Sequence, residues 1–578
     1  VVGRLLLGDG IDVRPESHGT AAPAAAQQGY HAGVHAQVDQ FQPQPGQLFF
    51  QQRCGVHLLK TQLRVTVQLV LKGPQLSFQS SGLLQQLHDL PILSVLRAAA
   101  RCYIIIELFF TILQNVVLCK EENEVGTTQT QATNDFSRGS MARNIVNMAV
   151  PMTVAQLINI LYNVVDRMYL GRLPGHLALT GLGLCLPIIS IIMGFANLCG
   201  MGGSPLCSIH RGRGENDEAE RIMGNSFTLL LLFGLGITTF CLLLRRPILY
   251  LFGASDLTFP YANDYLTIYI LGTVFVMVGL GMNPFINAQG FSRMGMMTVA
   301  LGAVVNIVLD PIFIFALDMG VRGAALATVI SQACSAVWVL KFLTGRRAIL
   351  KLRLSALPLH AGRVRRILSL GTSGFVMSMT NSLVQVLCNA TLQAWGGELY
   401  VGVMTVINSI REVISMPVQG ITNGCQPVLG YNYGAGEYQR VRQGIRFTTI
   451  LTMSYSLVVW LLVLIFPQFL IRIFNDESDL IVAGIPAFRI YFATFFCMSF
   501  QFIGQAVFVG LGRSKQAVFF SLLRKAFIVA PLTLLLPVLG FGVDGVFLAE
   551  PISNVIGGLA CLLTMYVVVY RALDKMES

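Results

Sequence analysis

Long apolar runs follow one another from residue 145 to the end of the chain, separated by short charged or Gly/Pro-containing links. Most reach the length of about 20 residues that an α-helix needs to cross a hydrocarbon core of about 30 Å. The runs are continuous, without the alternation of membrane strands. We therefore predict an all-α polytopic membrane protein with twelve transmembrane helices. Their approximate limits are 145–170, 177–200, 222–244, 263–288, 295–317, 322–343, 366–394, 400–427, 445–471, 485–511, 515–539 and 543–570.

The sequence repeats itself after 222 residues. The recurring residues are Pro205, Gly212, Gly214 and Glu215, which return as Pro427, Gly434, Gly436 and Glu437, and the run from Gly320, which returns from Gly542. This period is far too long for a solenoid unit and indicates a duplicated domain, as in many transporters. We expect two parallel six-helix repeats around a central cleft: an N-lobe at 141–344, a basic cytoplasmic linker at 345–365 and a C-lobe at 366–578.

Basic residues gather in the links after the second, sixth, eighth and tenth predicted helices, for example Arg211, Arg346, Arg440 and Arg513. Links on the opposite side carry more acid, such as Asp256. The positive-inside rule places the basic links and both termini in the cytoplasm of a multi-pass plasma (inner) membrane protein. Loop topology therefore explains the net charge of +11 better than nucleic-acid binding does.

The first 140 residues differ from the rest, because they contain none of the 21 Met residues and are rich in Gln, Ala and His. They indicate either a low-complexity, disordered or loosely helical extension, or translated upstream sequence that is not native; we favour the second. The apolar stretch 104–119 contains Glu107 and is short for a membrane span. Residues 120–138 are interpreted as a cytosolic tail.

An enzyme of this composition would be an intramembrane hydrolase, which needs a nucleophile and base or metal ligands within the spans. Hydrophobic residues make up 54% of the chain and charged residues 12%. The twelve cysteines form no C-x-x-C pair, the predicted spans contain no His, and no H-E-x-x-H motif occurs. We expect no catalytic residues and no cofactor, and partners limited to small-molecule substrates and the lipid bilayer.

Acidic residues inside spans are the best pointers to function, because each is costly in a membrane unless it is paired, hydrated or ion-bound. The first predicted helix carries Tyr162, Asn163 and Asp166, with Tyr162 and Asp166 on one face. The fifth carries Asn306 and Asp310, again one turn apart. Pro311 follows Asp310 and leaves the carbonyl of Ile307 without its helical partner.

These groups fall at similar depth in the outer half of the predicted bilayer, together with Thr328 of the sixth helix. Carboxylate, amide, hydroxyl and carbonyl oxygens suit Na⁺. Burial and a neighbouring like charge also favour a shared proton. We predict a cation-coupling site for Na⁺ or H⁺ at Asp166, Asn306, Asp310 and Thr328. The alternative for either acid alone is a hydrogen-bonded packing role.

Other polar positions leave alternatives open. Pro151 is either an ordinary proline at a helix start or a functional bend. Arg411 and Glu412 either line a cavity or form an inter-helix ion pair. Glu550 is the repeat counterpart of Thr328. The candidate C-lobe cavity residues are Gln385, Asn389, Arg411, Glu412 and Glu550.

At these residues the chain resembles the multidrug and toxic compound extrusion (MATE) family over about residues 136–578. The resemblance rests on Pro151, Tyr162-Asn163-x-x-Asp166, Asn306-x-x-x-Asp310, Thr328, and Pro427 with the segment from Gly430 to Gly436. It implies twelve helices in two lobes, and export of cationic or amphipathic compounds in exchange for Na⁺ or H⁺. In the DinF-like branch, the four acid, amide and hydroxyl positions form the N-lobe cation site. Residues matching Pro151, Asn159 and Tyr162 belong to a bending helix and a nearby drug cavity, to which we add Asn163.

The NorM branch of the family keeps acidic residues in the seventh and tenth helices. Neither of these two predicted helices contains an acidic residue here. We therefore predict a monomeric multidrug antiporter of the DinF-like type with one N-lobe cation site. One alternative is a lipid-linked oligosaccharide flippase, which would need a strongly cationic cavity, whereas Arg411 is the only mid-span arginine that we identify. Another is a non-transporting membrane sensor.

Overall fold

The computed structural model describes residues 135–170, 177–474 and 477–577, apart from a few side chains. All of them belong to the compact unit Gln129–Ser578. The expected N-terminal extension therefore lies outside the described residues, except for its last six positions. The apolar stretch 104–119 and most of the expected cytosolic tail also lie outside them.

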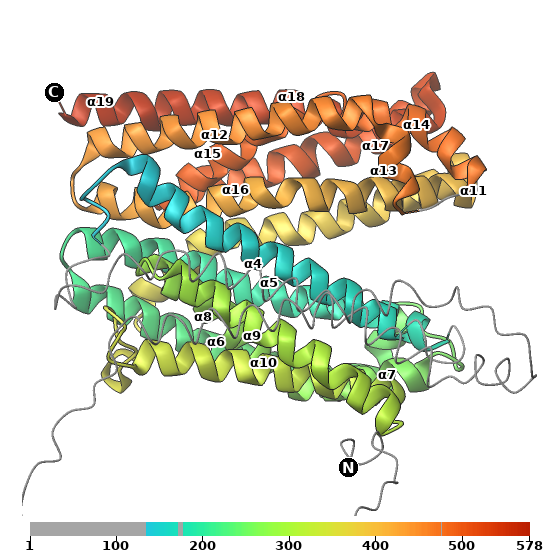
Figure 1. Ribbon diagram of the computed structural model, residues 1–578, viewed down its shortest axis with the longest axis horizontal. Helices are drawn as coiled ribbons and strands as arrows, with labels where there is room; N and C mark the ends of the chain where they lie inside the picture. Colours follow the sequence, from blue (N-terminus) through green and yellow to red (C-terminus); the bar gives the residue numbers. More distant parts are fainter. Residues whose placement is uncertain (1–134, 171–176, 475–476, 578) are drawn as a thin grey trace, which may run out of the picture. The chain divides into compact units, whose positions relative to one another are not determined.

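The N-lobe is built from apolar helices that run from Met141 to Thr344. Figure 1 shows them in cyan to yellow-green, with α4 beside the other lobe. Their bounds are α4 Met141–Leu170, α5 Leu177–Gly212, α6 Asn216–Leu251, α7 Phe259–Leu271, α8 Thr273–Ala288, α9 Ser292–Pro311, the short π-helix η3 Ile312–Ala316 and α10 Gly320–Thr344. Helix α4 packs against both α9 and α11, so it contacts both lobes.

The C-lobe follows the 3₁₀ turn η4 Leu354–Ala356 and is drawn from yellow to red in Figure 1. Its helices are α11 Ala361–Gly434, α12 Tyr438–Ile465, α13 Pro467–Arg472, α14 Ser478–Phe492, α15 Met498–Gly510, α16 Ser514–Leu522, α17 Ala530–Leu536, α18 Gly542–Met565 and α19 Arg571–Glu577. Short 3₁₀ or π segments join them: η5 Phe495–Cys497, η6 Leu523–Val529, η7 Pro537–Phe541 and η8 Tyr566–Tyr570.

Eight continuous helices in the described residues are long and apolar enough to cross a membrane, or ten when two bent helix pairs each count as one span. Two of the eight contain a glycine with non-helical backbone, Gly397 in α11 and Gly540 in η7. Figure 1 shows α11 turning back on itself, so its two arms cover two of the predicted spans. With the same division at Gly540, the described helices account for the twelve predicted spans.

The 222-residue repeat recurs in backbone geometry. Gly214 and Gly436 both have φ of 78°, a left-handed conformation that glycine adopts without steric cost. The helices that follow begin at equivalent positions, Asn216 and Tyr438. Likewise Gly320 and Gly542 begin α10 and α18 with φ of 52° and 53°. The duplicated domain predicted from sequence is therefore confirmed as two lobes of one fold.

The lobes touch where α5 ends in one copy and α11 ends in the other. A Cβ atom on Gly212 would lie 2.0 Å from the carbonyl oxygen of Tyr431, and one on Gly434 would lie 2.0 Å from that of Ile209. Tyr431 is the repeat equivalent of Ile209, so each lobe makes the same backbone contact with the other. We call this contact the glycine seal. It closes the two lobes against each other at the end that carries Gly214 and Gly436.

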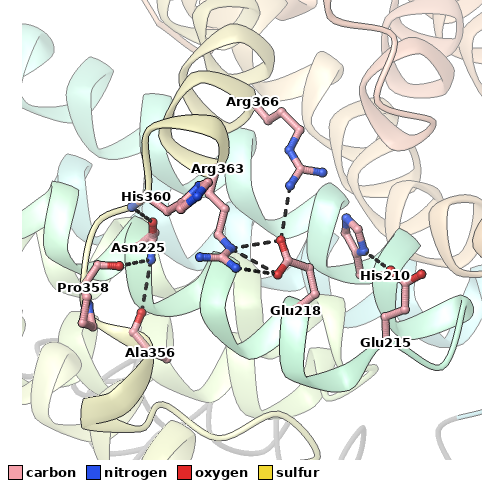
Figure 2. Close-up of polar contacts among 9 residues, drawn as sticks. All are labelled: His210, Glu215, Glu218, Asn225, Ala356, Pro358, His360, Arg363 and Arg366. Carbon is pink, nitrogen blue, oxygen red and sulfur yellow. Dashed lines mark hydrogen bonds and ion pairs between the residues drawn. The ribbon is translucent and has the colours of Figure 1, made fainter.

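The linker between the lobes is bound to α6 of the N-lobe (Figure 2). Glu218 accepts hydrogen bonds from Arg363, the shortest at 2.8 Å, and forms an ion pair with Arg366 at 3.2 Å. Asn225, which is fully buried, accepts from the backbone N–H of His360 and donates to the carbonyl of Pro358. We call these contacts the linker clasp. Arg363 and Arg366 belong to α11, so the clasp fixes the beginning of the C-lobe to the N-lobe.

The first described residues, which precede α4, bind the end of α11. Asp135 accepts a hydrogen bond of 3.0 Å from the Tyr431 hydroxyl, and the carbonyl of Phe136 accepts from Asn432 and Arg440. Partial burial opposes ionisation of Asp135, but hydrogen bonds from Ser137 and Tyr431 outweigh it and lower the pKa of that carboxyl below its usual value. Asp135 is therefore a charged anchor for this segment.

Candidate functional site

Three of the four residues predicted to form the cation-coupling site meet where α9 faces α10. Asn306 and Asp310 lie one turn apart on α9, and the Asn306 amide donates to Asp310 Oδ1 at 3.2 Å. The same amide lies 3.5 Å from the hydroxyl of Thr328 on α10. Asp310 is fully buried and Asn306 nearly so. The helical spacing seen in the sequence therefore produces a real cluster.

The fourth residue, Asp166, reaches this cluster from α4. Its carboxyl group is close enough to that of Asp310 for a side-chain hydrogen bond, and Tyr162 lies within electrostatic reach of both. Two carboxyl groups can hydrogen-bond to each other only when one of them carries a proton. If both are ionised, their repulsion in a buried site requires a cation between them. The structure thus brings together all four predicted coupling residues.

Two acceptor atoms at the cluster are available to such a cation. In the described part of the chain, Asn306 Oδ1 and Asp310 Oδ2 are buried and receive no assigned hydrogen bond. A buried acceptor without a donor is costly, and a bound proton or metal ion would remove that cost. In the same described residues no group of three His, Cys, Asp or Glu side chains converges. The donor set, two carboxylates with amide and hydroxyl oxygens, fits a proton or a hard monovalent cation.

Two prolines modify the helices that carry the cluster. Pro311 ends α9, and the next five residues form the π-helix η3. Pro151 lies inside α4, more than two turns past Met141, so its interpretation as an ordinary helix-start proline is wrong. Since Pro151 has no N–H, the carbonyl of Asn147 has lost its helical donor. The Ser292 hydroxyl of α9 donates to that carbonyl instead, at 3.1 Å.

Of the remaining residues predicted on the first helix, one lines a cavity whose wall comes mainly from the N-lobe. Asn159 lines a cavity of about 230 Å³ together with Met152, Gln156 and residues of α8 such as Asn283 and Asn287. Asn163 donates to the carbonyl of Asn159 at 2.6 Å, and neither it nor Tyr162 lines the cavity. Helix α4 is continuous through Pro151 in this structure. It carries both a cavity wall and Asp166.

A larger cavity of about 500 Å³ lies between α11, α15 and the α16–η6 segment and adjoins the first. Both cavities are lined by Gln156, Asn197, Met201, Asn423 and Gln426, so residues of both lobes enclose one central space. Of the residues predicted for the C-lobe cavity, Gln385, Arg411 and Glu412 line it, whereas Asn389 does not. The predicted central cleft is therefore present as this pair of adjoining cavities.

Glu550 stands behind the wall of the larger cavity, in a charge cluster that sequence analysis missed. It accepts a hydrogen bond from Arg524 at 2.8 Å and from Lys525 at 2.9 and 3.1 Å. Arg524 also donates to Asn554 at 3.1 Å. These four residues are at most 7% exposed, although Arg524 and Lys525 line the cavity. The statement that Arg411 is the only mid-span arginine is therefore wrong.

The signal for this cluster was present in the sequence. Arg524 and Lys525 lie well inside the predicted span 515–539, and two adjacent basic residues there are as costly as the acids used to find the N-lobe cluster. Adjacent residues of a regular α-helix point about 100° apart, which argues against a shared partner. The π-helix η6 changes that geometry, and both side chains reach Glu550.

Comparison with known proteins relates both lobes to one family. A family model described as MatE matches residues 151–312 and 375–535. The Multidrug export protein MepA of Staphylococcus saprophyticus is 24% identical over 447 residues, covering 76% of this chain and 97% of that protein. The protein of the same name from Staphylococcus aureus is 23% identical over 436 residues, covering 75% and 95%.

Solved structures show the same fold. One is described as an outward-facing conformation of a multidrug resistance MATE family transporter of the MOP superfamily, and it matches with a TM-score of 0.73 at 22% identity. It covers 78% of this chain and 100% of its own. A second, described as MATE in the bent conformation, gives the same TM-score, identity and coverage. Because the family model matches more than half of the chain, with one stretch in each lobe, the chain belongs to the MatE family.

Proposed function

We propose that this chain is an antiporter that exports cationic or amphipathic small molecules in exchange for Na⁺ or H⁺. The observation that carries the proposal is the placement of α4. This helix contributes Asp166 to the facing pair of carboxyl groups and lines the central cavity with Met152, Gln156 and Asn159. The same helix thus touches a cation-binding cluster and a space for a substrate.

Antiport follows if the two ligands favour different states of the transporter. A cation bound between Asp166 and Asp310 removes the repulsion that otherwise separates α4 from α9. The position of α4 then changes the cavity wall, and substrate binding weakens. Each ligand shifts the equilibrium only by its difference in affinity for the two states, so the coupling is reciprocal. Pro151 is the natural place for α4 to bend, because a proline removes one hydrogen bond from the helix. The carbonyl of Asn147, which loses that bond, accepts from the Ser292 hydroxyl instead.

The relatives support export of drugs, since both are named multidrug export proteins. The positive-inside argument supports a plasma-membrane protein with cytoplasmic termini, and we propose that it acts as a monomer. No catalytic role is proposed for any residue.

The test is transport in vesicles that contain the full-length chain. A panel of amphipathic dyes, including ethidium, is loaded, and efflux is driven separately by a Na⁺ or an H⁺ gradient. We expect one gradient to drive dye efflux. Asp166→Asn and Asp310→Asn should each reduce that efflux to the rate of protein-free vesicles, because Asn keeps the size but cannot bind a proton or balance a cation.

Asp544→Asn is the matched control, since Asp544 is exposed in the first turn of α18. This variant should transport at the unmodified rate. The mechanism is refuted if the two cluster variants still drive dye efflux. Dye binding without flux under either gradient would instead identify a membrane sensor.

A second candidate function, a lipid-linked oligosaccharide flippase, gains support from the missed cluster. Arg411, Arg524 and Lys525 all line the cavity, as a pyrophosphate would require. Absence of dye flux together with protein-dependent movement of a polyprenyl pyrophosphate across the vesicle bilayer would favour this function over drug export.

A further inference from the structure

The cation exchange proposed above leaves the charges of the larger cavity without a role. The charged side chains that line the two cavities, among the described residues, are Arg411, Glu412, Arg524 and Lys525. Three are positive and one is negative. The N-lobe side of the space is lined by neutral amides such as Asn283 and Asn287. The positive charge is therefore concentrated on the C-lobe wall.

Glu550 does not neutralise this wall completely. Its two carboxylate oxygens are used by Arg524 and Lys525. Arg411 lies within electrostatic reach of Glu550 and Glu412, but its Nε donates to no acceptor among the described residues. Together, the three basic side chains and the two acids, Glu412 and Glu550, carry a net charge of +1. Arg411 is the member of the cluster whose charge has the weakest protein partner.

Two guanidinium nitrogen atoms in this wall also lack acceptors. Nε of Arg411 and Nε of Arg524 are buried, and neither donates to a described acceptor. A guanidinium group binds carboxylate, sulfonate or phosphate oxygens through several parallel N–H donors. Leaving such donors unused inside a membrane protein is costly unless water or a ligand supplies the oxygens. These unused N–H donors can therefore bind the oxygens of an anionic group.

The rest of the cavity wall consists mainly of neutral polar side chains, with a smaller group of adaptable apolar ones. Met377, Met498 and Phe502 line the same space, and Met201 lies where the two cavities adjoin. Methionine side chains adjust to ligands of different shape. A space of about 500 Å³ falls in the ordinary range for small-molecule pockets. The methionine and phenylalanine side chains therefore provide an apolar part of the wall for the body of a ligand with one charged end.

The repeat explains why the lobes differ. Glu550 occupies the position equivalent to Thr328, so both lobes place a polar oxygen at the same point. In the N-lobe, two acids face each other and require a cation. In the C-lobe, one acid is already bound by two cations of the chain itself. The first arrangement accepts a positive ligand, whereas the second has spare positive charge.

We propose that the larger cavity binds amphipathic organic anions, with the ligand's carboxylate or sulfonate at Arg411 and its apolar body against the methionines. Arg524 and Lys525 strengthen the local positive field. This inference rests on the proposed transport function and names amphipathic anions as the substrate class of the larger cavity. The cavity should prefer organic acids to permanent cations of similar size.

The test compares two fluorescent probes that share one dansyl group, dansylglycine with a carboxylate and dansylcadaverine with an ammonium group. Binding to the purified full-length chain is measured by equilibrium dialysis. We expect dansylglycine to bind more tightly than dansylcadaverine. Arg411→Gln should weaken dansylglycine binding by about tenfold or more, the usual effect of losing a charge-assisted hydrogen bond. Glu412→Gln should strengthen it, because the variant removes the one acid that lines the cavity.

Arg365→Gln is the matched control. It removes one positive charge from the same helix at an exposed position that lines neither cavity. Dansylglycine affinity should stay within twofold of the unmodified protein. Opposite effects of Arg411→Gln and Glu412→Gln would exclude general damage to α11, because damage lowers affinity in both variants.

Three results would overturn the inference: tighter binding of dansylcadaverine, absence of dansylglycine binding, or Arg411→Gln within twofold of the unmodified protein. Gradient-driven dye efflux would still support antiport in each case. Conversely, dansylglycine binding that depends on Arg411, without flux under either gradient, supports the inference and refutes antiport.

Discussion

Asp310 and Glu550 are both acids buried inside a lobe, at 0% and 5% exposure, yet their charges are balanced differently. Glu550 is held by Arg524 and Lys525, whereas Asp310 has the neutral Asn306 amide and the acid Asp166 beside it. A buried ion pair that loses one partner leaves an uncompensated charge. A like-charged pair that loses one charge is relieved of repulsion. The two acids should therefore respond to substitution in opposite directions.

We predict that Glu550→Gln destabilises the protein by about 3–5 kcal/mol, since Arg524 and Lys525 lose their shared counter-charge. Asp310→Asn should be neutral or stabilising at neutral pH. Thermal unfolding of the detergent-purified variants, followed through the buried cysteines by a thiol-reactive dye, measures both. Equal destabilisation of the two variants would contradict this account of the buried charges.

The N-lobe cluster was predictable because its residues obey simple helical rules. Asn306 and Asp310 are four positions apart, and Tyr162 and Asp166 repeat that spacing. The C-lobe cluster depends on a π-helical segment and on two adjacent residues that reach one acceptor. A local departure from α-helical geometry is not readable from spacing alone. The sequence did show two basic residues inside one predicted span. Their cost in a membrane is a better guide to a buried charge cluster than helical spacing is.

Helices α5 and α11 form the contact between lobes that must open if access alternates. At the glycine seal, the backbone of each helix lies too close to the other for any side chain. Even the methyl group of alanine would meet a carbonyl oxygen at 2.0 Å. Backbone atoms cannot move aside without moving the helix, so substitution there acts on the lobes as a whole.

We predict that Gly212→Ala, and Gly434→Ala equally, shifts the protein away from the closed arrangement at this end. Spin labels at Arg213 and Gln439, both exposed beside the seal, should show a longer distance population by pulsed electron resonance. Gly236→Ala in α6 is the control, because a Cβ there meets nothing within 4 Å. An unchanged distance distribution in both seal variants would mean that the seal does not control closure.

At the scale of the whole molecule, apolar run length and the repeat period predicted two lobes of six spans, and the structure confirms this organisation. Span ends were less predictable. Helices α5 and α6 run to Gly212 and Leu251, beyond the apolar limits of about 200 and 244, because polar residues continue a helix as readily as apolar ones once it has begun. The contacts between lobes were not predictable, since they depend on glycine positions that match only after folding.

The linker clasp has a consequence for how this molecule can be divided. The clasp residues that follow Gly345 bind Glu218 or Asn225 of the N-terminal part. If the chain were cut at Gly345, the second fragment would keep the linker segment that binds it to the first fragment.

We predict that fragments 1–345 and 346–578, expressed as separate polypeptides in one cell, co-purify and restore dye efflux. Glu218→Gln combined with Asn225→Ala in the first fragment should reduce co-purification severalfold, whereas the same substitutions in the uncut chain should leave the halves together. Failure of the unmodified fragments to associate would show that the linker clasp cannot hold two separate fragments together. Success would mean that this duplicated transporter retains the ability to work as a complementing pair, encoded by two genes and assembled after translation.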